Sequence, residues 1–116
     1  MKRVILLSLT VIALCSFSIY PFLSTNLKVT VLDEVGSYVE GASVTLYGTE
    51  DDYRNEKNAV SETLKTNDKG QVTFKKLKPK AYFIYVEKGD MNNDGGAAQT
   101  NPLEEGKLNK VNIIIE

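Results

Sequence analysis

Residues 81–86 read AYFIYV, the most apolar and aromatic-rich run downstream of the N-terminal segment. Such a run suits a central strand covered on both sides better than a strand at a sheet edge. Pro79 stands just before it and cannot donate to a sheet ladder, so it fits the approach to a strand. Residues 81–86 therefore predict the centre of a β-sheet domain.

Two segments on the N-terminal side, 26–33 and 42–47, alternate apolar and polar side chains with the period of a half-buried strand. The inward side chains are expected to be Leu27, Val29, Val31, Ala42, Val44 and Leu46. The outward side chains of the second segment are expected to be Ser43, Thr45 and Tyr47. Both segments predict strands with one face on a core.

Residues 59–66 and 71–77 flank the turn-forming sequence NDKG, which predicts a hairpin with Gly70 at positive φ. Residues 110–116 alternate again and predict a last strand. Thr49 precedes three acidic residues, a pattern open to a single helical turn or to a polar loop. Residues 89–108 predict a long loop of the kind that often carries function.

These segments give six strands, with a seventh expected at 37–39 or within 103–108. We therefore predict an all-β fold, an antiparallel Greek-key β-sandwich of about seven strands. The side chains predicted to be buried in its core are Leu46, Phe74, Phe83, Val86, Val111 and Ile113.

The N-terminus has the layout of a secretory signal, a basic residue pair followed by an apolar run over residues 4–14. We assign residues 1–24 to a signal helix or membrane segment and residues 25–116 to one β-sandwich domain. Two alternatives stay open, lipidation at Cys15 and an uncleaved spanning helix. The objection to lipidation is Leu14, which is larger than the residue that usually precedes a lipidated Cys. All three predict an exported protein, in the periplasm, at the cell envelope or secreted.

The composition of the 116 residues excludes several classes of site. The chain has no His and one Cys, so a Ser-His-Asp or Cys-His nucleophile, a zinc cluster and a disulfide framework all lack their residues. Fourteen basic against 15 acidic residues give no field that would hold a polyanion, so nucleic acid is not an expected partner.

Three motifs in order resemble the carboxypeptidase regulatory-like domain family. They are the VLD..G....GASV pattern of residues 31–44, TNDKGQVTF at 66–74, and LKPKAY at 77–82. Two positions depart from the family pattern, Tyr38 where Pro is frequent and Lys80 where Gly is usual. The resemblance, which extends to small stand-alone exported bacterial proteins, implies a transthyretin-like, carbohydrate-binding-like fold with an accessory or scaffold role.

The resemblance brings no catalytic residues to this chain. The transthyretin-like fold also includes an enzyme, hydroxyisourate hydrolase. Its chemistry resembles general-base catalysis by histidines, and it carries a C-terminal Tyr-Arg-Gly-Ser. This chain has no His and reads NIIIE over residues 112–116. We therefore predict a protein that is not an enzyme.

Residues 90–95 read DMNNDG and fit the first half of a calcium loop, with Asp90, Asn92 and Asp94 as candidate ligands. The twelfth position, which should be Glu, is Asn101, so the second half of the loop does not fit. The alternative is that Asp, Asn and Gly stand there as turn formers. Ca²⁺ is thus the one cofactor that the sequence suggests.

Together these features predict a non-catalytic binding, accessory or scaffold module whose partner is a protein or glycan of the cell envelope. It would touch a membrane only through its N-terminal segment. The alternative is a calcium-dependent glycan- or protein-binding module that uses the 89–108 loop. Tyr82 and Tyr85 face opposite sides of their strand, so one of them could join an aromatic binding surface.

Overall fold

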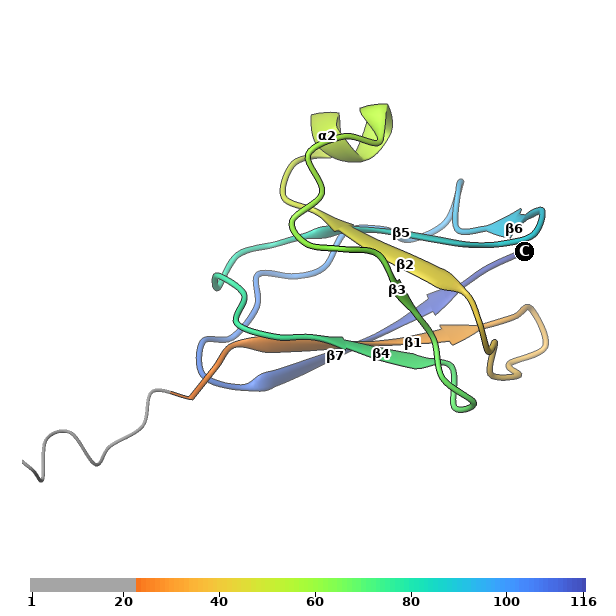
Figure 1. The fold of residues 1–116 in the computed structure, drawn as a ribbon, viewed down its shortest axis with the longest axis horizontal. Coiled ribbons are helices and arrows are strands. Elements are labelled where there is room, and N and C mark those ends of the chain that lie inside the picture. Colours follow the sequence, from red (N-terminus) through yellow and green to blue (C-terminus); the bar gives the residue numbers. More distant parts are fainter. Residues whose placement is uncertain (1–22) are drawn as a thin grey trace, which may run out of the picture.

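The computed structural model describes residues 23–116, which fold into two β-sheets packed face to face (Figure 1). The first sheet has the order β4-β1-β7, formed by β4 (Gln71–Phe74), β1 (Asn26–Leu32) and β7 (Leu108–Ile114). The second has the order β3-β2-β5-β6, formed by β3 (Leu64–Lys65), β2 (Ser43–Tyr47), β5 (Phe83–Lys88) and β6 (Met91–Asn92). The predicted all-β sandwich of about seven strands is confirmed. The predicted signal helix and Cys15 lie outside the described residues.

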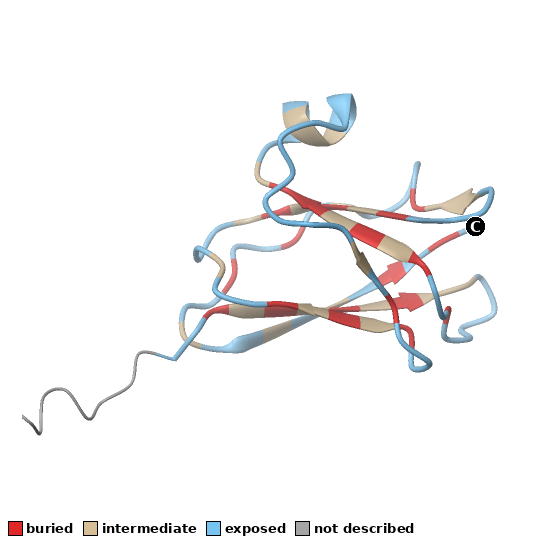
Figure 2. Ribbon diagram, in the orientation of Figure 1, coloured by how far each residue is buried: buried red, intermediate tan, exposed pale blue. Residues whose placement is uncertain are grey.

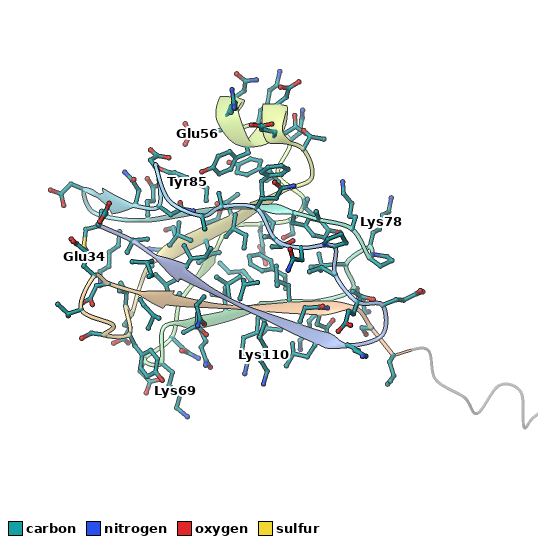
Figure 3. All side chains as sticks on the ribbon, turned by 180° about the vertical axis from the view of Figure 1, so that it is seen from behind. Glu34, Glu56, Lys69, Lys78, Tyr85 and Lys110 are labelled. Carbon is teal, nitrogen blue, oxygen red and sulfur yellow. The ribbon has the colours of Figure 1, made fainter. Side chains whose placement is uncertain are left out.

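One strand pair differs from the antiparallel arrangement that we predicted. β1 and β7 run parallel, in a register from Asn26 opposite Leu108 to Leu32 opposite Ile114, whereas the other strand pairs are antiparallel. The reason is the connection, because the chain leaves β6 in the second sheet and crosses back before it starts β7. This crossing places β7 at an edge of the first sheet, in the foreground of Figure 3.

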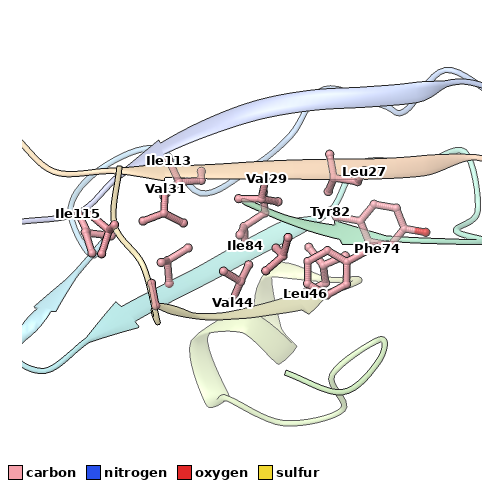
Figure 4. Packing of buried hydrophobic residues seen from close by; sticks show 14 of the residues in the cluster. Leu27, Val29, Val31, Val44, Leu46, Phe74, Tyr82, Ile84, Ile113 and Ile115 are labelled. Carbon is pink, nitrogen blue, oxygen red and sulfur yellow. The ribbon is translucent and has the colours of Figure 1, made fainter. Parts of the chain in front are cut away.

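The core lies between the two sheets and follows the predicted alternation. All six predicted inward side chains of β1 and of residues 42–46 are fully buried. Figure 2 shows buried and partly buried residues alternating along the strands, and Figure 4 shows the packed side chains from close by. The largest fully buried apolar side chains are Leu27, Leu46, Ile84 and Ile115. Period-two patterning therefore determined which strand faces meet.

Two of the six predicted core residues are only half-buried, Phe83 and Val111. Phe83 cannot share a face with Val86, because an odd and an even position of one strand point to opposite sides. In β5 the inward residues are Ile84 and Val86, and Phe83 lies on the outer face. Val111 belongs to an edge strand, so the core covers it on one side only.

The predicted turn before β4 is confirmed, with Gly70 at φ +68°. The predicted hairpin is wrong, because β3 pairs with β2 and β4 pairs with β1, so the turn connects the two sheets. A Cβ at Gly70 would lie 2.7 Å from the carbonyl oxygen of Val31, so the close approach as well as the φ value requires glycine. Asn67 Oδ1 accepts the N–H groups of Lys69 and Gln71 and closes the turn. Lys80 does not have a positive φ; in this loop it is Lys76 that does, with φ 57°. The departure at Lys80 therefore causes no backbone strain.

The polar segment after β2 is a helix, α2 (Glu50–Asn55), which decides between the two alternatives left open by the sequence. Thr49 Oγ1 accepts the N–H of Asp52 at 3.1 Å, and the acidic first turn suits the positive end of the helix dipole. Among the described residues, no helix has the length and apolar character to cross a membrane.

The seventh strand is neither of the two segments that we expected. It is β6, inside the predicted 89–108 loop, where Asn92 pairs with Glu87 of β5. Residues 37–39 contribute only a single bridge, between Tyr38 and Leu32.

Candidate functional site: an aromatic hollow on the second sheet

Aromatic side chains gather on the outer face of the second sheet, under helix α2. Tyr47 from β2 and both Phe83 and Tyr85 from β5 point away from the core, and Tyr53 of α2 packs against all three. The ring centroid of Tyr53 lies 6.0 Å from that of Tyr47, 6.0 Å from Phe83 and 6.3 Å from Tyr85. Edge-to-face and tilted contacts at this distance are the favourable geometries for aromatic pairs.

Because of this cluster, a side chain that points away from the core can still be shielded from solvent. The alternation correctly placed Tyr47 on the outer face, yet the residue is 5% exposed because α2 and its neighbours cover it. Tyr53 and Tyr85 are half-buried, so parts of both rings remain in contact with solvent. Figure 3 labels Tyr85 on the side of α2, close to the helix end that carries Glu56.

Three of the four aromatic side chains, those of Tyr53, Phe83 and Tyr85, line two adjoining hollows, which together we call the aromatic hollow. The first is about 310 Å³ and is lined by Tyr53, Arg54, Glu56, Tyr85 and Asp94. The second is about 350 Å³ and shares Tyr53, Arg54 and Asp94 with the first, adding among others Phe83, Gly95 and Gln99. The aromatic hollow therefore lies between α2 and the residues that follow β6.

Acidic groups surround the Tyr85 hydroxyl. It donates to Glu87 Oε2 at 3.2 Å, and Asp94 and Glu56 add further negative potential. Burial first, and then these carboxylates, raise the pKa of Tyr85 to about 12. Burial and the charge of Asp94 also raise the pKa of Tyr53. Both hydroxyls are protonated at neutral pH and can donate hydrogen bonds, as that of Tyr85 does to Glu87.

Arg54 is the one basic side chain among the described residues that line the hollow, and it is paired. Arg54 Nη2 donates to Glu50 Oε1 at 2.6 Å, across one turn of α2. Because this pair is exposed, it adds little to stability, but it offsets the charge of the guanidinium. The lining of the hollow is thus aromatic and acidic.

Asn93 positions the segment that forms the far wall of the hollow. β6 pairs with β5, and pairing resumes at Ala98, whose carbonyl oxygen accepts the N–H of Ile84. Between these points residues 94–97 leave the edge of the sheet. Asn93 fills the gap: its Oδ1 accepts the N–H of Val86 at 3.0 Å, and its Nδ2 donates to the carbonyl of Ile84 at 2.8 Å.

This role of Asn93, which is 2% exposed, was not predicted from the sequence. In the run DMNNDGG it resembles any other turn former, and nothing local distinguishes it from Asn92. Only the pairing of β5 with two separate segments leaves an unpaired N–H and C=O for an amide side chain to satisfy. The residue is therefore identified by tertiary structure alone.

The three predicted calcium ligands lie around β6. Asp90 and Asp94 are exposed, and Asn92 Oδ1 already accepts the N–H of Asp94 at 2.9 Å, which is the geometry of an Asx turn. Asp94 lines the aromatic hollow. Within residues 23–116, no three Asp, Glu, Cys or His residues come together as a metal-binding group. The calcium site remains a prediction.

Tyr82 and Tyr85 lie on opposite faces of the second sheet, as predicted. Tyr82 is buried in the core, and its hydroxyl both accepts from the N–H of Lys78 and donates to the Lys78 carbonyl. Burial raises the pKa of Tyr82, opposed by the Lys78 backbone hydrogen bond. Tyr82 therefore has a structural role, and Tyr85 is the tyrosine of β5 that reaches the candidate site.

Comparison with known proteins supports the fold and leaves the function open. No family model matches the chain, and no curated protein matches its sequence. Eleven chains of solved structures match, and one of them is the Bacillus anthracis TIE protein, with a TM-score of 0.56 and 19% identity. The match covers 81% of this chain but only 16% of that protein's chain. At this identity the likeness shows a shared all-β sandwich fold.

Proposed function

We propose that the chain is a non-catalytic, exported β-sandwich that acts as a binding, accessory or scaffold module at the cell envelope, with the aromatic hollow as its binding surface. The observation that carries this proposal is the gathering of partly exposed Tyr53 and Tyr85 with the carboxylates of Glu56, Glu87 and Asp94. An outer sheet face needs only polar side chains to stay soluble, so four packed aromatic rings at this place call for a further reason.

The chemistry of the hollow indicates the kind of group that it would hold. The faces of Tyr53 and Tyr85 offer apolar contact, and the carboxylates accept hydrogen bonds. The acidic surplus disfavours an anionic group and favours a neutral polyhydroxylated or a cationic group. A protein or glycan of the envelope would supply such groups.

The non-catalytic part of the proposal rests on the lack of histidine and on the protonation state of the two tyrosine hydroxyls. The chain has no His, and tyrosine hydroxyls, whose ordinary pKa of 10.0 is raised further at Tyr53 and Tyr85, stay protonated at neutral pH. A general base needs a pKa near the working pH, which these hydroxyls lack. The export part rests on the signal-like N-terminal residues and on the family resemblance.

Affinity capture from the native envelope tests the proposed surface. The bait is the wild-type chain, compared with a Tyr53→Ala, Tyr85→Ala variant and with a Tyr38→Ala control, whose tyrosine is 62% exposed and lies outside the hollow. We expect a specific partner to be retained by wild type and Tyr38→Ala and lost from the double variant. Equal retention by all three would contradict the hollow as binding surface, and hydrolysis of a substrate by the purified protein would contradict the non-catalytic role.

The alternative function is calcium-dependent binding of a glycan or protein through the 89–108 loop. It is favoured by one observation, that Asp94 is both a predicted calcium ligand and part of the lining of the hollow. If Asp90, Asn92 and Asp94 bind Ca²⁺, millimolar calcium should raise the melting temperature, since a ligand at 100 times its Kd stabilises by about 2.7 kcal/mol. A melting temperature that calcium leaves unchanged, or a shift that survives Asp90→Ala with Asp94→Ala, would contradict this alternative.

A further inference from the structure

The four outer edges of the two sheets differ in length. β3 and β6 have 2 residues each and β4 has 4, whereas β7 has 7. Short edge strands, and charged or proline residues within them, are the means by which proteins avoid edge-to-edge association. β7 contains no Pro, and Lys110 is its one charged residue. β7 is therefore the one long and weakly protected edge among the described residues.

The outer side of β7 is also unoccupied by any other strand within residues 23–116. β1 takes its inner side over the whole length from Leu108 to Ile114. Beyond β7 the chain turns inward, where Ile115 donates to the Leu32 carbonyl and Glu116 pairs with Asn92. A hollow of about 500 Å³ lies along residues 108–111, with residues 100–104 as its other wall, and a second of about 280 Å³ is lined in part by Asn112 and Ile114. The view of Figure 3 looks onto this side.

We propose that β7 pairs antiparallel with β7 of a second copy of this chain, across a two-fold axis at Val111. The two three-stranded sheets would then join into one continuous six-stranded sheet. In this register Leu108 lies opposite Ile114 of the second copy, and Lys110 lies opposite Asn112 of the second copy. A two-fold contact of this kind uses the same surface on both copies and closes on itself.

The residue pattern of β7 fits its own copy. Leu108 and Ile114 are 44% and 58% exposed, and both point to the outer face of the first sheet. The proposed register pairs each with the other, so both apolar side chains gain a cross-strand neighbour. Half-buried Val111 meets its own copy, and β-branched side chains pair well across strands.

Charge distinguishes this register from the adjacent ones. A shift that moves the axis to Lys110 would place Lys110 opposite Lys110 of the second copy, which is unfavourable. A shift that moves the axis to Asn112 would place Lys110 opposite Ile114 and Leu108 opposite Glu116. With the axis at Val111, the two exposed apolar residues of the outer face, Leu108 and Ile114, meet each other and the lysine meets a neutral amide.

This inference goes beyond the proposed function and does not depend on it. The aromatic hollow lies on the outer face of the second sheet, whereas the proposed contact extends the first. A dimer would therefore carry two aromatic hollows, and two linked sites can raise the apparent affinity for a multivalent partner.

Sedimentation equilibrium of the purified full chain, as it accumulates after export, tests the inference. We expect wild type to dimerise in a concentration-dependent manner. The Leu108→Lys, Ile114→Lys variant places two lysine pairs directly opposite each other and should raise the dimer Kd about tenfold or more. The Leu108→Lys, Ile114→Glu variant places a lysine opposite a glutamate at both positions and should restore association.

Val35→Lys with Val60→Lys is the matched control, since these valines are 84% and 42% exposed and neither belongs to β7. The control should dimerise like wild type, and circular dichroism should show that all variants are folded. A wild type that stays monomeric at about 1 mM overturns the inference, whether or not another segment of the chain covers the β7 edge. So does a dimer that persists in the Leu108→Lys, Ile114→Lys variant, or one that the opposite-charge variant fails to restore. A monomeric result would leave the affinity-capture test of the aromatic hollow unaffected.

Discussion

The outer faces of the two sheets have the same strand alternation and very different surroundings. On the first sheet, Lys28 lies beside Lys110 and Thr30 beside Asn112, and no helix within residues 23–116 covers them. On the second sheet the equivalent positions hold Tyr47, Phe83 and Tyr85, under Tyr53 of α2. An outward position on a strand is therefore not a solvent position, because a short helix with one tyrosine can turn that face into a second apolar layer.

The difference separates stability from recognition. The inner faces of both sheets supply the core, where the side chains of Ile84 and Leu46 are fully buried. The outer face of the second sheet supplies partly exposed rings and carboxylates. Of two adjacent residues, Ile84 belongs to the core and Phe83 to the outer aromatic layer. Substituting each of them in turn is the most direct test of this distinction.

Ile84→Ala should have the largest effect on stability. Ile84 is fully buried, so its truncation should lower the free energy of unfolding by about 2 to 5 kcal/mol. Phe83→Ala removes a larger side chain from the half-buried outer face and should cost only about 1 to 2 kcal/mol. Urea unfolding of both variants checks the order. If Phe83→Ala were the more damaging of the two, α2 would have to be part of the main core.

Asn93→Ala should have the next largest effect, because it tests whether one amide holds the far wall of the hollow. The substitution leaves the N–H of Val86 and the carbonyl of Ile84 without their partners and should cost about 2 to 4 kcal/mol. Asn92→Ala removes one exposed acceptor and should cost less than about 1 kcal/mol. Thermal melts of the two variants give the comparison, and equal losses would remove the special role of Asn93.

Thr49→Ala should have a smaller effect that is confined to the cover of the second sheet. Loss of the hydrogen bond from the N–H of Asp52 should cost about 1 kcal/mol and loosen α2. Thr49→Ser keeps an acceptor oxygen and serves as the control. Hydrogen exchange should speed up in α2 and stay unchanged in β1. Faster exchange in both would show that α2 and the core unfold as one unit.

The raised pKa of Tyr85 should have the smallest effect, because it changes the stability of the fold only at alkaline pH. The pKa of Tyr85 is raised from 10.0 to about 12, so the native state favours the protonated hydroxyl. Its contribution to stability is complete below pH 10 and is lost as the pH rises toward about 12. Glu87→Gln removes one carboxylate and should lower the pKa of Tyr85, which absorbance of the tyrosinate measures. A pKa that does not move would mean that Glu87 contributes nothing to the shift.

Much of the fold could be predicted from sequence because strands that pack a core must repeat every second residue. The alternation in residues 26–33 and 42–47 identified the inward side chains of β1 and β2, and Asn67 with Gly70 identified the turn that connects the two sheets. Strand lengths were predicted less well, since β3 has only 2 residues. Phe83 was misplaced because an aromatic-rich run has no polar side chain to show which parity faces out.

The sequence by itself determined the sandwich class, the faces of the long strands and the glycine turn, because these depend on local periodicity and backbone geometry. The tertiary structure alone decided that Tyr53 covers β5 and that β7 lies parallel to β1 at an open edge. It also decided that the side chain of Asn93 hydrogen-bonds the backbone of β5 where strand pairing is interrupted. Each of these joins residues that are distant in the chain or belong to separate strands. Such contacts are set by how the elements meet in space, and no local pattern encodes that meeting.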